Sequence, residues 1–228
     1  MLGSRFGRNV ALDKAFPEAM PGLMEPNPHV ISRTLMRRGE FVPATTLNLL
    51  AASWIQFQTH DWFSHGREPV DTIEVDLPDG HAWHENPMRV PRTRQDPTRG
   101  DKDAHLPPTY INSESHWWDS SGIYGSTPEK QRRVRSLQDG KLVVENGRLP
   151  VDVSTGTAVT GFSENWWVGL GMLHTLFTLE HNAICDALKA AHPQMDDDEL
   201  FGTAQLVNSA LIAKRGNEAI TMRELAEK

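Results

Sequence analysis

The sequence predicts a mainly α-helical protein with long ordered loops. Apolar residues recur at helical spacing in three separate segments of the chain. Between the first and second of these, residues 66–112 are rich in Pro, Gly, Asp and Arg and show little periodicity. With 228 residues, 38% hydrophobic and 23% charged, the composition suits a globular protein and not a disordered one.

The first predicted helix has one apolar face, formed by Leu47, Leu50, Trp54 and Phe57. Thr45 or Thr46 would cap its start, and it would end near Ser64. Residues 1–42 contain four prolines and are expected to form an irregular arm. A short strand is expected near Thr72–Val75, within an otherwise wrapping loop.

Two smaller elements are predicted in the middle of the chain. Ser126–Glu129 has the pattern of a capping box with proline near the first turn, which predicts a short helix through Val134. Lys141–Val144 and Leu149–Val153 flank a turn at Gly147 and are expected to form a small hairpin.

Two long helices are predicted in the last third of the chain. The first begins near Glu164 and has a stripe formed by Leu170, Leu173, Phe177, Ile184 and Leu188. Asp196–Asp198 supplies negative charge where the next helix should begin. Its stripe is Leu200, Ala204, Val207 and Leu211. The segment after Lys214 is polar and only weakly periodic.

These patterns divide the chain into an arm (residues 1–42), a helical domain (43–214) and a tail (215–228). The net charge of −7 disfavours nucleic acid and anionic membranes as partners. No apolar stretch is long enough to cross a bilayer. Met1–Val10 is a poor secretory signal, and Cys185 has no internal partner. A cytoplasmic location is therefore expected, with peripheral membrane contact left open.

The segment from Asn48 to Gly66 holds the first candidate site. On a helix, Gln56 and His60 lie on one face. A neutral imidazole can take a proton from one peroxide oxygen and return it to the other, while a carboxamide one turn earlier holds a water or the second oxygen. Asp61 points about 100° away and can serve a different site. A packed polar pair would show the same Gln/His spacing.

The segment from Ser113 to Ser126 holds the second candidate site. Ser115, Trp117, Asp119 and Ser121 alternate, so in an extended loop they face one side. Two hydroxyls, one carboxylate and the Trp117 carbonyl could converge there. With Asp61 they would form an oxygen-only cage of about six or seven ligands, which suits Ca²⁺. An ordinary Ser/Asp-rich turn is the alternative.

Other residues have simpler explanations. His81 and His84, with His65 nearby, have a generic spacing and no cysteine, so surface histidines are favoured over a zinc site. His181 is expected to be a buried hydrogen-bonding residue. Ser163 lacks the second glycine of a hydrolase nucleophile elbow.

In their order and spacing the two segments resemble the animal-type haem peroxidases, a superfamily that includes cyclooxygenases and fatty-acid α-dioxygenases. The segment Leu173–Leu188 resembles the family helix with an Arg/Lys-Glu-His-Asn signature, although Leu179 replaces the basic residue. Within the superfamily, the residues of these segments resemble the α-dioxygenases more than the other members. The resemblance covers residues 45–214 and implies a haem-peroxidase-like helical domain that acts on peroxide or dioxygen and possibly a fatty acid.

The resemblance also implies roles for individual residues. His60 matches the distal haem histidine, and Gln56 lies beside it. The calcium ligands fall on Asp61, Ser115, Trp117, Asp119 and Ser121. Thr59 replaces the acid found where haem is covalently bound, so a non-covalent haem b is implied. The expected catalytic arginine is absent from residues 160–167.

The family's proximal iron ligand is a downstream histidine, and no histidine follows His192. The dioxygenases also need a tyrosine near that ligand, whereas Tyr110 and Tyr124 lie upstream. An incomplete haem oxidoreductase, from a truncated or split reading frame, is therefore expected. The alternative is a non-catalytic, calcium-stabilised module or pseudoenzyme that self-associates or acts with a second chain.

Overall fold

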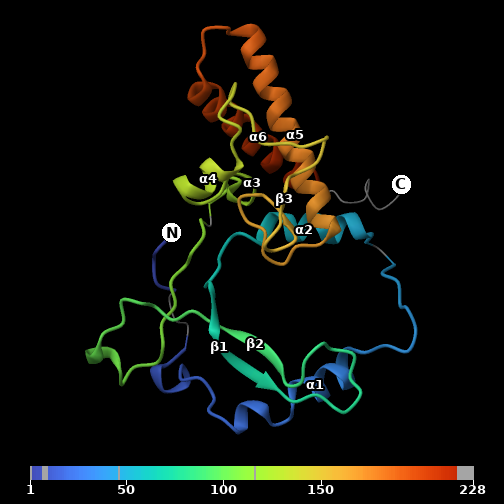
Figure 1. The fold of residues 1–228 in the computed structure, drawn as a ribbon, viewed down its shortest axis with the longest axis vertical. Coiled ribbons are helices and arrows are strands. Elements are labelled where there is room, and N and C mark those ends of the chain that lie inside the picture. The colour runs from blue at the N-terminus through green and yellow to red at the C-terminus, as the bar shows by residue number, and fades with distance from the viewer. Residues whose placement is uncertain (1, 7–9, 46, 116, 220–228) are drawn as a thin grey trace. The chain divides into compact units, whose positions relative to one another are not determined.

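The computed structural model describes residues 2–6, 10–45, 47–115 and 117–219 (Figure 1). The chain forms two compact units. The helical unit comprises residues 1–2, 44–63 and 114–228, and the ribbon unit comprises residues 3–43 and 64–113. The predicted division at residues 42–43 lies close to a unit boundary, but residues 64–113 group with the N-terminal arm and not with the helices.

The helical unit is built around one long helix. Its elements are α2 (Leu49–Thr59), α3 (Ser121–Tyr124), α4 (Pro128–Val134), β3 (Val151–Asp152), β4 (Thr157–Ala158), α5 (Val168–Ala191) and α6 (Asp197–Ala219). α5 packs against α2, α3 and α6, and Figure 1 shows α5 and α6 side by side. The core contains Phe57, Ile123, Tyr124, Val134, Leu142, Leu170, Leu173, Phe177, Phe201 and Ile212. This confirms the mainly helical fold class.

The start of each helix has a local cause. Asn48 caps α2 by accepting a hydrogen bond from the Ala51 N–H, so the cap lies two to three residues after the predicted threonine caps. Thr46 itself lies outside the described residues. The predicted short helix is present as α4, but its N-cap is Thr127, one residue after Ser126 of the predicted capping box. At α6, the Asp196 carboxylate accepts from the Glu199 N–H, and Glu199 accepts from the Asp196 N–H.

α5 begins at Val168, four residues later than predicted. Asn165 has a positive φ of 55°, and Trp167 is extended at the N-cap position. Residues 160–167 therefore form an irregular segment that packs beside the end of α2, where it contributes to the site described below.

The ribbon unit contains a two-stranded antiparallel sheet, β1 (Arg67–Val75) with β2 (Met88–Thr93). This confirms the strand predicted near Thr72–Val75, but its partner was expected to be loop. The other elements are short: η1 (Leu12–Lys14), η2 (Gly22–Met24), α1 (Pro28–Ile31), η3 (Ser32–Met36) and η4 (Asp101–Asp103).

The predicted hairpin around Gly147 is wrong in its pairing. Only Glu145 and Arg148 form a bridge across the turn. Leu142 pairs with Arg135 instead, and its N–H and carbonyl bind the Asn182 side chain at 2.8 and 3.0 Å. Val151–Asp152 pairs onward with Thr157–Ala158. Helix α5 thus provides hydrogen-bonding partners that a hairpin would otherwise have supplied.

Candidate active site and calcium site

Asp61, directly after the last residue of α2 and its C-cap, is the centre of a cluster of oxygen atoms. Asp61 is 8% exposed, and its Oδ2 accepts hydrogen bonds from Ser121 Oγ at 2.8 Å and from the Gly122 N–H at 2.6 Å. Ser115 Oγ donates to Asp119 Oδ2 at 2.7 Å, and the Ser121 N–H donates to Asp119 Oδ1 at 3.1 Å. The two carboxylates are therefore joined through Ser121.

The alternating loop reaches this geometry through one unusual residue. Ser120 has a left-handed backbone (φ 59°), which turns the chain into α3 so that Ser121 reaches Asp61. Ser121 Oγ lies 3.5 Å from the Ser115 carbonyl oxygen. The Trp117 N–H donates to Ser115 Oγ at 3.4 Å. Of the predicted calcium ligands, Asp61, Ser115, Asp119 and Ser121 are brought together by hydrogen bonds.

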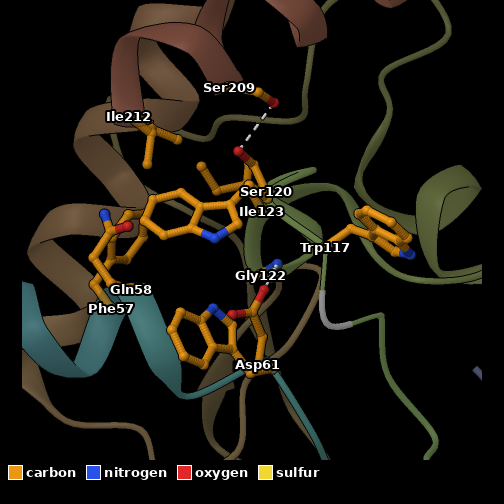
Figure 2. A pocket seen from close by; sticks show the side chains of 11 residues that line it. Phe57, Gln58, Asp61, Trp117, Ser120, Gly122, Ile123, Ser209 and Ile212 are labelled. Carbon is orange, nitrogen blue, oxygen red and sulfur yellow. Dashed lines mark hydrogen bonds between the residues drawn. The ribbon is translucent and has the colours of Figure 1, made fainter. Parts of the chain in front are cut away.

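Burial makes the Asp61 carboxylate unfavourable without a cation. The pKa of Asp61 is raised, mainly because burial removes its charge from water; the Ser121 hydrogen bond and the nearby His60 oppose this only in part. A cavity of about 30 Å³ lies beside Asp61, with Trp117 and Gly122 among its lining residues (Figure 2). Its volume has room for about one or two water molecules.

The donor set fits calcium by chemistry. Two carboxylates, two hydroxyls and nearby carbonyls are oxygen ligands of the kind that Ca²⁺ takes, and bound waters commonly complete its shell. Within the described parts of the chain there is no cluster of three or more His, Cys, Asp or Glu residues suited to a metal. Calcium here would therefore depend on the serine and carbonyl oxygens as well as on Asp61 and Asp119.

A second set of residues, which the sequence patterns did not indicate, anchors Ser115. The Ser115 N–H donates to Ser126 Oγ at 2.9 Å, and Ser126 Oγ donates to Glu114 Oε2 at 2.7 Å. Glu114 is 2% exposed and forms an ion pair with Lys130 of α4. The sequence pattern had assigned Ser126 to the cap of α4, whereas its hydroxyl binds Glu114.

Gln56 and His60 do lie one turn apart, but their side chains do not meet. Gln56 Oε1 accepts from Trp167 Nε1 at 2.7 Å, and its Nε2 donates to the Asn165 carbonyl at 3.3 Å. It is the Gln56 backbone carbonyl that lies 3.2 Å from His60 Nδ1. In this structure the carboxamide therefore holds the irregular segment before α5, and the predicted catalytic role of Gln56 stays a prediction.

His60 has a partner that the sequence analysis missed. His174 of α5 is fully buried, and its Nε2 lies 3.3 Å from His60 Nε2. Burial, aided by the nearby His60, lowers the pKa of His174 well below its usual value, so this imidazole is neutral. Thr160 Oγ1 lies 2.9 Å from His174 Nδ1. Only tertiary packing brings α2, α5 and residue 160 together.

Aromatic rings surround the two imidazoles. The ring centroids of Phe57 and Trp166 each lie 5.0 Å from that of His174, and Phe162 lies 5.4 Å from His60. His60 is half-buried at the edge of this group. The two imidazoles therefore lie in a largely aromatic environment at the end of α2.

A model of the animal haem peroxidase family matches residues 2–224. The chain belongs to the animal haem peroxidase family. Over 215 residues it is 38% identical to alpha-dioxygenase PIOX of Oryza sativa, a match that covers 92% of this chain and 33% of the relative. The crystal structure of the Arabidopsis thaliana fatty acid alpha-dioxygenase, 36% identical, superposes with a TM-score of 0.75 and covers 93% of this chain and 33% of that one.

This member of the haem peroxidase family thus spans about a third of the length of the curated relatives it matches. Peroxidase A of Dictyostelium discoideum is 21% identical with a TM-score of 0.71, over 93% of this chain and 48% of that one, which is a likeness of fold. These similarities confirm the predicted family and its α-dioxygenase branch.

Two further predictions concern His181 and the cellular location of the protein. His181 is fully buried and lies 2.9 Å from Tyr124 Oη and from the Gly140 carbonyl, which confirms its expected hydrogen-bonding role. In the described part of the chain, no helix combines the length and apolar character needed to span a membrane. The predicted cytoplasmic location stays a prediction.

Proposed function

We propose that this chain provides the distal half of a haem-dependent oxidoreductase of the peroxidase or fatty-acid α-dioxygenase type. One observation carries the proposal: the consecutive residues His60 and Asp61 both lie beside Gly122. A Cβ atom built on Gly122 would lie 3.2 Å from Asp61 Oδ2 and 3.4 Å from His60 Cε1. The same turn of α3 therefore fixes the acid/base histidine and the carboxylate of the calcium cluster.

In this function His60 acts as the distal acid and base. Its imidazole would accept and return a proton at an oxygen of bound peroxide, or hold dioxygen by a hydrogen bond. Bound haem, non-covalent because Thr59 is not an acid, would supply the redox chemistry. Calcium held by Asp61, Ser115, Trp117, Asp119 and Ser121 would keep the end of α2 in place against the loop before α3.

The substrate class follows from the relatives. Alpha-dioxygenases are among the relatives that match over most of this chain, so a fatty acid and dioxygen are the proposed substrates, with peroxide as the alternative oxidant. No histidine follows His192 in this sequence, so the proposal concerns the distal side of the haem and assigns no proximal ligand.

A haemin titration of the chain with calcium present tests this function. We expect a saturable Soret band for the wild type and, for His60→Ala, a shifted band with affinity weakened at least several-fold. The matched control is His192→Ala, which removes an exposed histidine beyond the C-terminal end of α5 and should leave the spectrum unchanged. Identical titrations of the wild type and His60→Ala would contradict the proposed distal role.

A second candidate function rests on a different observation. Four apolar residues on one side of α5 are exposed: Val168 (78%), Met172 (45%), Leu176 (54%) and Leu179 (41%). Such a stripe favours a calcium-stabilised binding module that associates with another chain. Absence of a Soret band together with concentration-dependent association would favour this function over the haem oxidoreductase.

A further inference from the structure

Gln56 binds the segment before α5 through both ends of its carboxamide. Its Oε1 accepts from Trp167 Nε1 at 2.7 Å, and its Nε2 donates to the Asn165 carbonyl at 3.3 Å. An indole N–H only donates and a carbonyl only accepts, so the two partners fix which end of the carboxamide faces which residue. The side chain of Gln56 therefore has one orientation, directed at residues 165–167.

Trp167 is also held by its packing against α5. A Cβ on Gly169 would lie 2.4 Å from Trp167 Cη2 and 2.3 Å from Ser53 Oγ of α2. The indole and Ser53 therefore both pack directly against the Gly169 backbone, and only glycine leaves room for them. The hydrogen bond to Gln56 and the contact with Gly169 together give the Trp167 ring one position.

Trp166 lies between the two residues that Gln56 binds. Its ring centroid is 5.0 Å from that of His174, and a Cβ on Gly171 would lie 3.2 Å from Trp166 Cζ2. The Trp166 ring therefore packs against both the α5 backbone and the His174 imidazole, which faces His60 at 3.3 Å. Because both neighbours of Trp166 are bound by Gln56, the carboxamide sets the place of this ring beside the histidine pair.

The backbone of Gln56 also reaches the histidine pair. Its carbonyl oxygen lies 3.2 Å from His60 Nδ1, and the Phe57 carbonyl oxygen lies 3.3 Å from the same nitrogen. Both oxygens only accept, so His60 donates to them through Nδ1–H. Gln56 therefore holds His60 through its main chain and Trp166 through its side chain.

We propose that Gln56 is a positioning residue of the distal site: its carboxamide holds Trp166 against His174 and does not bind an oxygen of the substrate. To turn towards such an oxygen, the carboxamide would have to break its hydrogen bonds to both neighbours of Trp166. This role replaces the predicted one, in which the carboxamide holds a water or the second oxygen. Its meaning for catalysis rests on the proposed distal role of His60.

Fluorine-19 NMR of the chain labelled with 5-fluorotryptophan tests the proposal without haem. The seven tryptophans give one signal each, and single Trp→Phe variants assign them. Gln56→Leu keeps an apolar side chain but neither hydrogen bond, so we expect the Trp166 signal to shift or broaden. Trp117 and Trp118, which are exposed, should keep their signals. An unchanged Trp166 signal in Gln56→Leu would overturn the proposal.

The histidine pair gives a second readout, which ties the role of Gln56 to the site. The Cε1–H proton signal of His174 lies in the ring current of Trp166 and should shift in Gln56→Leu together with the Trp166 signal. Gln56→Glu keeps an acceptor for Trp167 Nε1–H and should restore most of both shifts. If Gln56→Glu and Gln56→Leu shift the two signals equally, the bond to Trp167 does not position the ring and the proposal fails.

A double variant and a neighbouring glutamine complete the test. Trp167→Phe removes the same hydrogen bond from the other partner, so adding Gln56→Leu to it should shift the Trp166 signal no further. Gln58, two residues along α2, lines the cavity beside Asp61 instead (Figure 2), so Gln58→Leu should leave the Trp166 signal unchanged. Additive shifts in the double variant, or equal shifts in Gln56→Leu and Gln58→Leu, would contradict the proposal.

The haemin titration answers a different question. If haemin fails to bind while Trp166 and His174 respond to Gln56→Leu, the haem function fails and the positioning role of Gln56 stands. If haemin binds and Trp166 is insensitive to Gln56, the haem function stands and the positioning inference fails.

Discussion

Replacing Gly161 by alanine is expected to lower the free energy of unfolding of the helical unit by about 3 kcal/mol or more. A Cβ at this position would lie 2.1 Å from the Gly125 nitrogen and 2.2 Å from the Ser121 carbonyl oxygen. Both are backbone atoms of the α3 turn and cannot rotate away. Since Ser121 and its neighbour Gly122 bind Asp61, the substitution should also disrupt the hydrogen-bonded cluster around Asp61, where calcium is proposed to bind.

Urea denaturation followed by tryptophan fluorescence measures this effect. The matched control is Gly202→Ala in α6, where no atom lies within 4 Å of a new Cβ. That variant should be unchanged or stabilised by up to about 1 kcal/mol, because alanine favours the helix. Equal unfolding midpoints for Gly161→Ala and wild type would show that the close approach to α3 is not present in solution.

Calcium is expected to raise the melting temperature of the wild-type chain by roughly 5–10 °C. Ligand at about 100 times its dissociation constant stabilises by about 2.7 kcal/mol, and a chain of this size gains about 2–4 °C per kcal/mol. The physical reason is that a cation offsets the cost of the buried Asp61 carboxylate, whose pKa burial raises. Asp61→Asn should therefore lose most of the calcium-induced shift.

Asp96→Asn is the matched control for that experiment. Asp96 is also a buried carboxylate (3% exposed) with hydroxyl donors, Thr98 and Thr109, but it lies in the ribbon unit and pairs with Arg5. Its replacement is expected to lower the melting temperature while leaving the calcium-induced shift intact. A full calcium shift in Asp61→Asn would place the ion elsewhere.

Much of the helical fold was predictable because its causes are local. Asp196 and Glu199 form the acidic start of α6, and Thr127 caps α4 one residue after the predicted cap Ser126, so both helices begin within about a residue of where short-range patterns place them. The hairpin prediction failed because Asn182, forty residues away, takes the hydrogen bonds of Leu142. Such a partner leaves no trace in the spacing of nearby residues.

The candidate site, too, was predictable only in part. Alternation in the loop pointed to Ser115, Asp119 and Ser121, but the loop is not extended throughout, and the left-handed Ser120 turns Ser121 towards Asp61. The contact between His60 and His174 depends on how α2 packs against α5. The Gln56 carboxamide accepts a hydrogen bond from Trp167 at the start of α5, and does not contact the His60 side chain. Spacing along one helix could not reveal either arrangement.

The most direct test of the account is the affinity of the wild-type chain for haemin, measured with and without calcium. If one turn of α3 fixes both His60 and Asp61, the two binding events are coupled, and coupling between sites is typically 5–150-fold. We predict that calcium tightens haemin binding at least about fivefold in the wild type and has no effect in Asp61→Asn. Equal haemin affinities with and without calcium in the wild type would contradict the proposed link between the calcium cluster and the distal histidine.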